Sequence, residues 1–162
     1  PGQFAHAKEI APALIGEGMS GLYARTAVSA EERTQVEKLL APTGQTLWVD
    51  REEQLDAVTA MSGSGPAYVF YLLEAWIEAG TTMGLSATQA RQLAMATLAG
   101  ATSLARDSDE TPAVLRERVT SKGGTTHAAI TSLEADGVRA AFVRALKAAQ
   151  QRAGELGDEF GR

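Results

Sequence analysis

Two glycines and two threonines stand at the predicted start of a helix, in the segment Ser121–Thr126 (SKGGTT). A helix start leaves several backbone N–H groups without an acceptor, and the helix dipole adds partial positive charge there. Such a helix start binds phosphate or carboxylate groups. Lys122 can add a full positive charge, and Thr126 can add a hydroxyl group. From the residues alone, an ordinary turn with a threonine as helix cap remains the alternative.

A second candidate is the segment Ser62–Tyr68 (SGSGPAY), in which two Ser-Gly pairs precede a proline. Proline is favoured in the first turn of a helix, so a helix is predicted to begin here. A turn with few side chains would also allow close approach of another backbone or of a ligand. Helix initiation without any ligand is the alternative.

A third segment, Gly16–Gly21 (GEGMSG), matches the dinucleotide-binding pattern G-x-G-x-x-G. That pattern needs a preceding strand, a following helix and an acidic residue about 20 positions later. Residues 23–28 (YARTAV) are strand-like or irregular, and neither Glu37 nor Asp50 follows a second clear parallel strand. We therefore predict that these glycines are strand or turn residues without a role in cofactor binding.

Other kinds of catalytic or metal site find no support in the residue types. The sequence has no cysteine, which excludes disulfides and thiolate zinc sites, and its two histidines are His6 and His127. No metal centre is expected from two histidines so far apart. His127 is close to Ser121 in sequence, but a hydrolase would also need an orienting acid and an oxyanion hole.

The composition is that of a soluble protein with a core. Apolar residues make up 44% of the 162 residues, and the net charge of −5 is spread without a basic patch, so nucleic acid is not an expected partner. The longest apolar segment, residues 67–77, is broken by Glu74 and is far shorter than the roughly 20 residues of a membrane span. The N-terminus lacks a secretory pattern, and a cytoplasmic protein without a membrane association is expected.

The predicted secondary structure that must position these motifs changes near Glu52, from a mixture of strands and helix to helices alone. The part before it predicts two short strands and one helix, at residues 19–26, 45–50 and 30–40. Ser29 and Glu32 form a capping box at the start of that helix. After Glu52 the chain is predicted to be almost wholly helical, beginning with a short helix capped by Asp50 and Glu53.

Five further helices are predicted, with bounds near residues 64–84, 86–106, 111–119, 128–135 and 138–156. The first is apolar nearly all round, which indicates that a partner subunit covers one of its faces. The second begins with a Ser86–Gln89 capping box and carries small residues that would allow close helix crossing, namely Ala94, Ala96, Ala99, Gly100 and Ala101.

Three sequence strings together resemble the pyrroline-5-carboxylate reductase family. They occur in the order DAVTAMSGSGPAYVFYLLEAW, GLSATQARQLAMATLAGA and RERVTSKGGTTHAAI, followed by two helices. Upstream, APALIGEGMSGL is similar to the segment that leads out of the nucleotide-binding domain of that family. The resemblance covers the chain from about Pro12 to its C-terminus and leaves residues 1–10 unmatched.

The resemblance implies a mainly α fold. It implies a helical dimerisation and substrate-binding domain of the 6-phosphogluconate dehydrogenase C-terminal-like type over residues 52–162. Residues 1–51 would be a small β-containing remnant of the nucleotide-binding domain.

The resemblance also implies an activity, which is the NADPH- or NADH-dependent reduction of 1-pyrroline-5-carboxylate to L-proline, the last step of proline biosynthesis. In this family an N-terminal Rossmann domain binds the cofactor, the helical domains interlock in a homodimer, and dimers often assemble into decamers. Ser121 and Gly123 would belong to the substrate loop. The amides of Gly124, Thr125 and Thr126 would hold the substrate carboxylate, and the hydroxyl of Thr126, the catalytic residue, would bind the ring nitrogen.

Two features depart from the family pattern. Lys122 stands where many members have proline. The glycine-rich nucleotide loop and most of the parallel sheet are missing from the sequence, so the chain is expected to be inactive alone and to bind no cofactor. No metal is implied.

Two other functions remain open at this point. One is a non-catalytic homo-oligomerisation module. The other is a related imine or hydroxyacid dehydrogenase, although hydroxyacid members normally use a catalytic lysine on a long helix, and no lysine occurs between Lys38 and Lys122.

Overall fold

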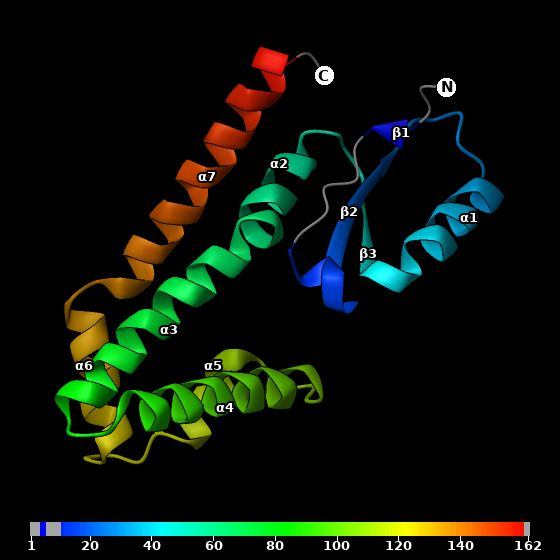
Figure 1. The fold of residues 1–162 in the computed structure, drawn as a ribbon. Helices are drawn as coiled ribbons and strands as arrows, with labels where there is room; N and C mark the ends of the chain where they lie inside the picture. The colour runs from blue at the N-terminus through cyan, green and yellow to red at the C-terminus, as the bar shows by residue number, and fades with distance from the viewer. Residues whose placement is uncertain (1–3, 6–10, 161–162) are drawn as a thin grey trace. The chain divides into compact units, whose positions relative to one another are not determined.

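The computed structural model describes residues 4–5 and 11–160 and is mainly helical, as predicted (Figure 1). Its α-helices are α1 (Ala30–Leu40), α2 (Gln54–Val58), α3 (Gly65–Thr82), α4 (Ala87–Arg106), α5 (Pro112–Arg118), α6 (Thr125–Ala135) and α7 (Val138–Phe160). Its strands are β1 (Phe4–Ala5), β2 (Gly18–Ala24) and β3 (Gly44–Val49), and short 3-10 or π turns span Ala11–Ile15, Ala41–Thr43 and Thr59–Gly63. His6 and most of the unmatched residues 1–10 lie outside the described residues.

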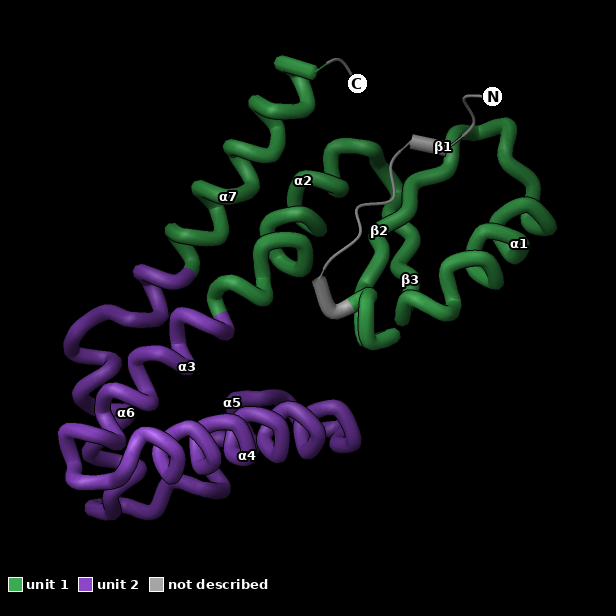
Figure 2. Tube along the Cα trace, in the orientation of Figure 1, with its two compact units in different colours: residues 1–68, 143–162 green, residues 69–142 purple. Residues whose placement is uncertain are grey.

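The chain divides into two compact units (Figure 2). Unit 1 comprises Pro1–Tyr68 and Val143–Arg162, and unit 2 comprises Val69–Phe142. Unit 1 therefore contains the sheet, and unit 2 contains α4, α5 and α6. Among the described residues, no helix is long and apolar enough to cross a membrane.

The sheet of unit 1 has the strand order β1-β2-β3. Strands β2 and β3 are parallel, paired from Gly18 with Gly44 to Tyr23 with Val49, and α1 connects them. Strand β1 pairs antiparallel with the end of β2 and adds a strand that the sequence did not predict. The core of this unit is small and includes Ser20, Leu22, Val28 and Ala60.

The glycines of the G-x-G-x-x-G match lie in a turn and a strand, as predicted. Gly16 has φ +74° in the turn before β2, and Gly18 and Gly21 belong to β2. A Cβ on Gly18 would lie 2.6 Å from the carbonyl oxygen of Thr43, and one on Gly21 would lie 2.6 Å from Cγ1 of Val58. These glycines therefore allow close packing within unit 1, and they lead into strand β2 rather than directly into a helix.

Helix α1 has the predicted bounds and the predicted cap. The backbone N–H of Glu32 donates to Oγ of Ser29 at 3.2 Å, and the N–H of Ser29 donates to Oε2 of Glu32 at 2.8 Å. On the same helix, Glu37 accepts a 2.6 Å hydrogen bond from Nε1 of Trp48, and the guanidinium of Arg33 lies 5.0 Å from the centre of the Trp48 ring. Both contacts hold α1 against β3.

The predicted cap of α2 is wrong. Neither Asp50 nor Glu53 caps the helix with its side chain, and instead Oε1 of Gln54 accepts the N–H groups of Asp50 and Arg51 at 3.0 and 2.9 Å. Residues 51–53 form a turn before the helix begins at Gln54. The side chain of the first helical residue therefore binds the backbone of the preceding loop, whereas the prediction had a loop side chain bind the backbone of the helix.

The segment Ser62–Tyr68 is not the predicted tight turn. Residues Thr59–Gly63 form a π-helical turn in which the N–H of Ser64 donates to the carbonyl oxygen of Thr59 at 2.8 Å, and α3 begins at Gly65. Pro66 has no N–H to donate to the preceding turn, and its ring disfavours regular α geometry there, so a widened turn before it is a physical consequence. Gly65 is the first residue of α3, and no atom of the rest of the described chain lies within 4 Å of the position of a Cβ on it.

In unit 2, α3 and α4 form a tight helical corner. Helix α3 ends in a Schellman motif, with Gly84 at φ +95° and the N–H of Leu85 donating to the carbonyl oxygen of Gly80 at 3.1 Å. The predicted Ser86–Gln89 capping box then begins α4. A Cβ on Gly80 would lie 2.6 Å from Cβ of Ala90, so the two helices approach closely at this point.

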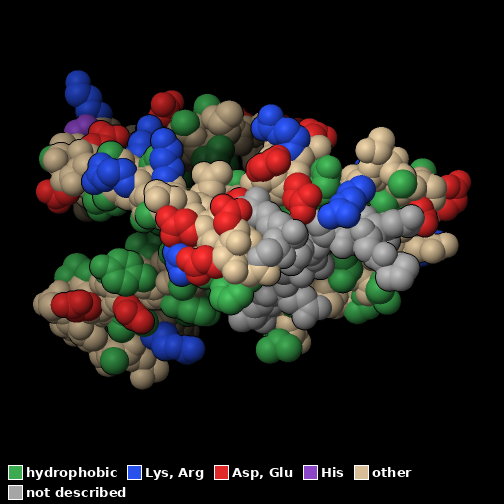
Figure 3. All heavy atoms as spheres, turned by 90° about the horizontal axis from the view of Figure 1, so that it is seen from above, with side chains coloured by type: hydrophobic (Ala, Val, Ile, Leu, Met, Phe, Trp, Pro, Cys, Tyr) green, Lys and Arg blue, Asp and Glu red, His purple; other side chains and the backbone are tan. Residues whose placement is uncertain are grey.

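The small residues of α4 behave only partly as predicted. Ala94 is buried, but the other four predicted contact residues, Ala96, Ala99, Gly100 and Ala101, are exposed in the single chain. Large apolar side chains of α3 are exposed as well, including Val69, Phe70, Tyr71, Leu72 and Trp76. Hydrophobic side chains accordingly lie on the molecular surface in Figure 3. Helix α3 thus presents apolar side chains on more than one side that its own chain does not cover.

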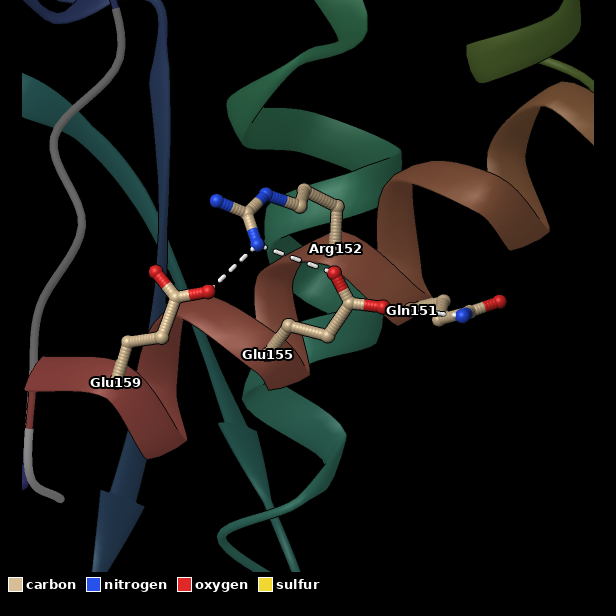
Figure 4. A network of polar contacts seen from close by, with 4 residues as sticks. All are labelled: Gln151, Arg152, Glu155 and Glu159. Atoms are coloured by element: carbon tan, nitrogen blue, oxygen red, sulfur yellow. Dashed lines mark hydrogen bonds and ion pairs between the residues drawn. The ribbon is translucent and has the colours of Figure 1, made fainter.

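The end of α7 is held by a network around Arg152 (Figure 4). Its Nη1 lies 2.8 Å from Oε1 of Glu159 and 3.1 Å from Oε2 of Glu155, and both bonds raise the pKa of the guanidinium. The pKa of Glu155 is lowered, chiefly by Arg152 and then by Gln151. These bonds compensate two acidic side chains near the negative end of the helix dipole, and α7 continues to Phe160, beyond the predicted end at about Leu156.

Candidate functional site

The five residues predicted to form the substrate loop all lie in one connection of unit 2, between α5 and α6. Ser121, Gly123 and Gly124 form the turn before α6, and Thr125 and Thr126 are the first two residues of that helix. Thr126 and Gly124 are half-buried, and the others are exposed.

The turn that precedes α6 requires glycine at two positions. The N–H of Gly124 donates to the carbonyl oxygen of Ser121 at 3.0 Å, which closes a four-residue turn. Gly123 occupies the third position with φ +76°, where a side chain would be strained. At Gly124 a Cβ would lie 2.6 Å from Oγ of Ser121, so a side chain there would displace that hydroxyl.

The helix start leaves backbone donors free. The first hydrogen bond of α6 runs from the N–H of Ala128 to the carbonyl oxygen of Gly124 at 3.1 Å. Within the described residues, the N–H groups of Thr125, Thr126 and His127 therefore have no protein acceptor. Three such donors at the positive end of a helix dipole can hold an anionic group.

Two details differ from the predictions for this site. The residue that caps α6 is Gly124, without a side-chain hydrogen bond, so the alternative of a threonine cap is wrong. The N–H of Gly124, expected to hold a carboxylate, is engaged by Ser121 in this structure. The free donors are shifted by one residue, to positions 125–127.

Helix α5 supports the loop from its other end. The hydroxyl of Thr111 accepts the N–H of Val114 at 3.4 Å at the start of this helix, as the predicted Thr-Pro helix start implies. At its end, Oγ1 of Thr120 donates to the carbonyl oxygen of Arg116 at 2.7 Å, which ties the residue before the loop back to the helix. The loop therefore leaves α5 in a fixed direction.

A contact that the sequence analysis missed joins the two helices around the loop. Nη1 of Arg116 in α5 lies 3.2 Å from Oε1 of Glu134 in α6. The two residues are 18 positions apart, and opposite charges at that separation give no recognisable sequence signal. Only the path of the chain between the two helices brings them together.

The described residues show neither a metal site nor a dinucleotide loop. They contain no group of three or more His, Asp or Glu side chains that could hold a metal ion. The glycines of Gly16–Gly21 face Thr43 and Val58, and they do not open a helix, so they do not fit the phosphates of a dinucleotide.

Comparison with known proteins identifies similar chains. The family model described as pyrroline-5-carboxylate reductase dimerisation matches residues 52–156. A pyrroline-5-carboxylate reductase of Pseudomonas aeruginosa is 50% identical over 150 residues, covering 93% of this chain and 55% of its own length. The chain thus spans about half the length of the curated relatives it matches.

Two solved structures are similar in fold as well. A pyrroline-5-carboxylate reductase from Coxiella burnetii superposes with a TM-score of 0.88 at 38% identity, over 93% of this chain and 56% of the other. The pyrroline carboxylate reductase of Plasmodium falciparum with NADP bound superposes with a TM-score of 0.86 at 29% identity, over 92% of this chain and 61% of the other.

Proposed function

Because this chain belongs to the pyrroline-5-carboxylate reductase family, we propose that it carries the substrate loop of an enzyme that reduces 1-pyrroline-5-carboxylate to L-proline. The observation that supports this proposal most directly is the start of α6, where three backbone N–H groups have no acceptor within the described residues. The substrate is a carboxylate, and these donors suit a carboxylate.

In this proposal the N–H groups of Thr125 and Thr126 hold the substrate carboxylate, and the turn Ser121–Gly124 shapes the loop around it. His127 presents a third donor one residue further along. Lys122 lies in the same turn and contributes positive charge. The loop binds the substrate through backbone groups whose positions are fixed by the helix, so little has to reorganise on binding.

The hydroxyl of Thr126 is proposed to hydrogen-bond the ring nitrogen of the substrate. The side chain is half-buried and has no hydrogen-bond partner among the described residues. A protonated imine is already electrophilic, so the protein mainly has to orient it. The nicotinamide cofactor, NADPH or NADH, supplies the hydride when it is bound, and we propose that residues other than those described here hold it.

We propose that the chain forms a homodimer through the apolar face of α3. Phe70 is 59% exposed and Tyr71 is 76% exposed, which is unusual for two aromatic residues on one helix of a soluble protein. The name of the matching family model, a dimerisation domain, supports this assignment. Size-exclusion chromatography with light scattering distinguishes one, two or ten chains of 17.0 kDa. Ten chains would be the decamer expected from the resemblance.

We also propose that residues 1–51 belong to the nucleotide-binding part of the enzyme and residues 52–162 to the helical part. The helical part begins near α2, and the match to the family model begins at residue 52. This boundary follows the chain order of the elements, because the strands precede residue 52 and the long helices follow it.

The substrate-loop proposal is tested by titrating the isotope-labelled chain with L-proline and following its backbone amide resonances. Saturable shifts of the Thr125, Thr126 and His127 amides are expected, and prolinamide, which lacks the carboxylate, should produce none. Equal shifts with prolinamide, or shifts confined to other residues, would overturn the proposal. The absence of any binding would favour an oligomerisation module without a substrate site.

The activity itself is tested by following NADPH oxidation with pyrroline-5-carboxylate as the substrate. The enzyme that comprises this chain and a cofactor-binding domain is expected to turn over, and the 162-residue chain alone is not. Reduction of a hydroxyacid or of a different imine in preference to pyrroline-5-carboxylate would reassign the substrate.

A further inference from the structure

The segment that carries the substrate loop is closed at its base by an ion pair. Arg116 lies in the last turn of α5 and Glu134 in the last turn of α6, with Nη1 and Oε1 3.2 Å apart, and Ser121–Thr126 lies between them in the sequence. We propose that this pair positions the substrate loop. The inference rests on the function proposed above for that loop.

The loop has few contacts of its own that would fix it. Ser121, Lys122, Gly123 and Thr125 are exposed, and Gly123 has no atom within 4 Å of the position of a Cβ. Glycines also widen the range of backbone conformations open to a free loop. The direction of the loop is therefore set by the two helices at its ends, and a contact between those helices limits its freedom.

Arg116 acts on the loop through two different groups. Its carbonyl oxygen accepts a hydrogen bond from the hydroxyl of Thr120 at 2.7 Å, which holds the residue directly before the loop. Its guanidinium reaches Glu134 on the helix whose first turn carries the free N–H groups. Arg116 thus contacts both the residue before the loop and α6, and loss of its side chain would remove the ion pair to α6 while leaving the bond to Thr120.

A merely structural surface ion pair is the competing explanation, and α5 provides a matched control. Arg118 is two residues further along the same helix, and it pairs with Glu110, which precedes α5 rather than following the loop. Replacing either arginine by glutamine removes the same charge from the same helix. Only Arg116→Gln breaks a contact across the loop.

The experiment compares Arg116→Gln, Arg118→Gln and the charge-reversed double variant Arg116→Glu/Glu134→Arg with the unmodified chain. The dissociation constant for L-proline is measured from the Thr125 and Thr126 amide shifts, and hydrogen exchange of the Gly124 amide reports the turn without ligand. We expect Arg116→Gln to weaken proline binding about two- to fivefold, the range for loss of a partly exposed ion pair. It should also speed exchange at Gly124, and the double variant should restore both.

The outcomes separate this inference from the proposed function. If the unmodified chain binds proline at Thr125 and Thr126 but Arg116→Gln behaves like Arg118→Gln, the positioning role is wrong and the substrate loop stands. If the unmodified chain does not bind proline there, the proposed function is wrong. Failure of the charge-reversed pair to recover what Arg116→Gln loses would also overturn the positioning role.

Discussion

Ser121 and Gly124 close the turn that precedes α6, with the N–H of Gly124 donating to the carbonyl oxygen of Ser121 at 3.0 Å. The side-chain hydroxyl of Ser121 occupies the space next to Gly124, 2.6 Å from where a Cβ would be. The turn therefore uses one N–H group of the glycine-rich segment for itself, and the next three N–H groups have no acceptor within the described residues.

Replacing Gly124 by alanine is expected to weaken the binding of L-proline roughly three- to tenfold. The new Cβ would lie 2.6 Å from Oγ of Ser121 and 3.2 Å from its carbonyl oxygen, so the hydroxyl must rotate away and the turn must open slightly, at a cost of about 1 kcal/mol. Adding Ser121→Ala removes the nearest atom and should recover part of the loss. Titration of the amide resonances measures both variants, and unchanged binding in Gly124→Ala would contradict the close contact.

Removing the hydroxyl of Thr126 is expected to slow the complete reductase without disturbing its assembly. Loss of one hydrogen bond to a charged group costs about 1.5–3 kcal/mol, which corresponds to roughly a tenfold to hundredfold fall in turnover. Thr126→Ala should show this fall in NADPH oxidation, and Thr126→Ser should retain most of the activity. An unimpaired Thr126→Ala enzyme would exclude the hydroxyl from the reaction.

The close crossing of α3 and α4 predicts opposite results for two glycines of unit 2. Gly80→Ala places a Cβ 2.6 Å from that of Ala90 and should destabilise the protein by about 1–3 kcal/mol. Gly100→Ala, in the middle of α4 with nothing within 4 Å, should stabilise it by about 0.5–1 kcal/mol because alanine favours a helix. Denaturant unfolding measures both, and Ala90→Gly should relieve the first. Similar effects of the two substitutions would argue against a tight crossing.

The cap of α1 predicts a pH dependence of stability. The backbone N–H of Ser29 and then its hydroxyl lower the pKa of Glu32. A carboxylate whose pKa is lower in the folded than in the unfolded state stabilises the fold above its unfolded pKa, about 4.3 for glutamate. That stabilisation is lost as the pH falls through the lowered pKa of the folded state.

Glu32→Gln should therefore be less stable than the unmodified protein at neutral pH and should approach it in acid. Denaturant unfolding at a series of pH values compares the two. A difference in unfolding free energy that stays constant down to strongly acid pH would show that the Glu32 carboxylate does not contribute through this cap.

The sequence determined the elements whose signals are local. The Ser29–Glu32 and Ser86–Gln89 boxes fixed the starts of α1 and α4, because a cap depends on residues three positions apart. The glycines and threonines of Ser121–Thr126 likewise indicated a helix start, and α6 begins at Thr125. The mainly helical fold class was also predicted from a local signal, because it follows from the helical periodicity of the chain after Glu52.

Contacts between residues distant in the chain were decided only by the tertiary structure. The Arg116–Glu134 pair depends on α5 lying beside α6, and the crossing at Gly80 and Ala90 depends on the angle of the corner at Gly84. The π-helical turn before Pro66 and the Gln54 cap each occur in place of the local structure that the sequence predicted. Local patterns fix where helices begin because their hydrogen bonds close within a few residues, whereas the packing of one helix on another is fixed by surfaces that the chain assembles only when it folds.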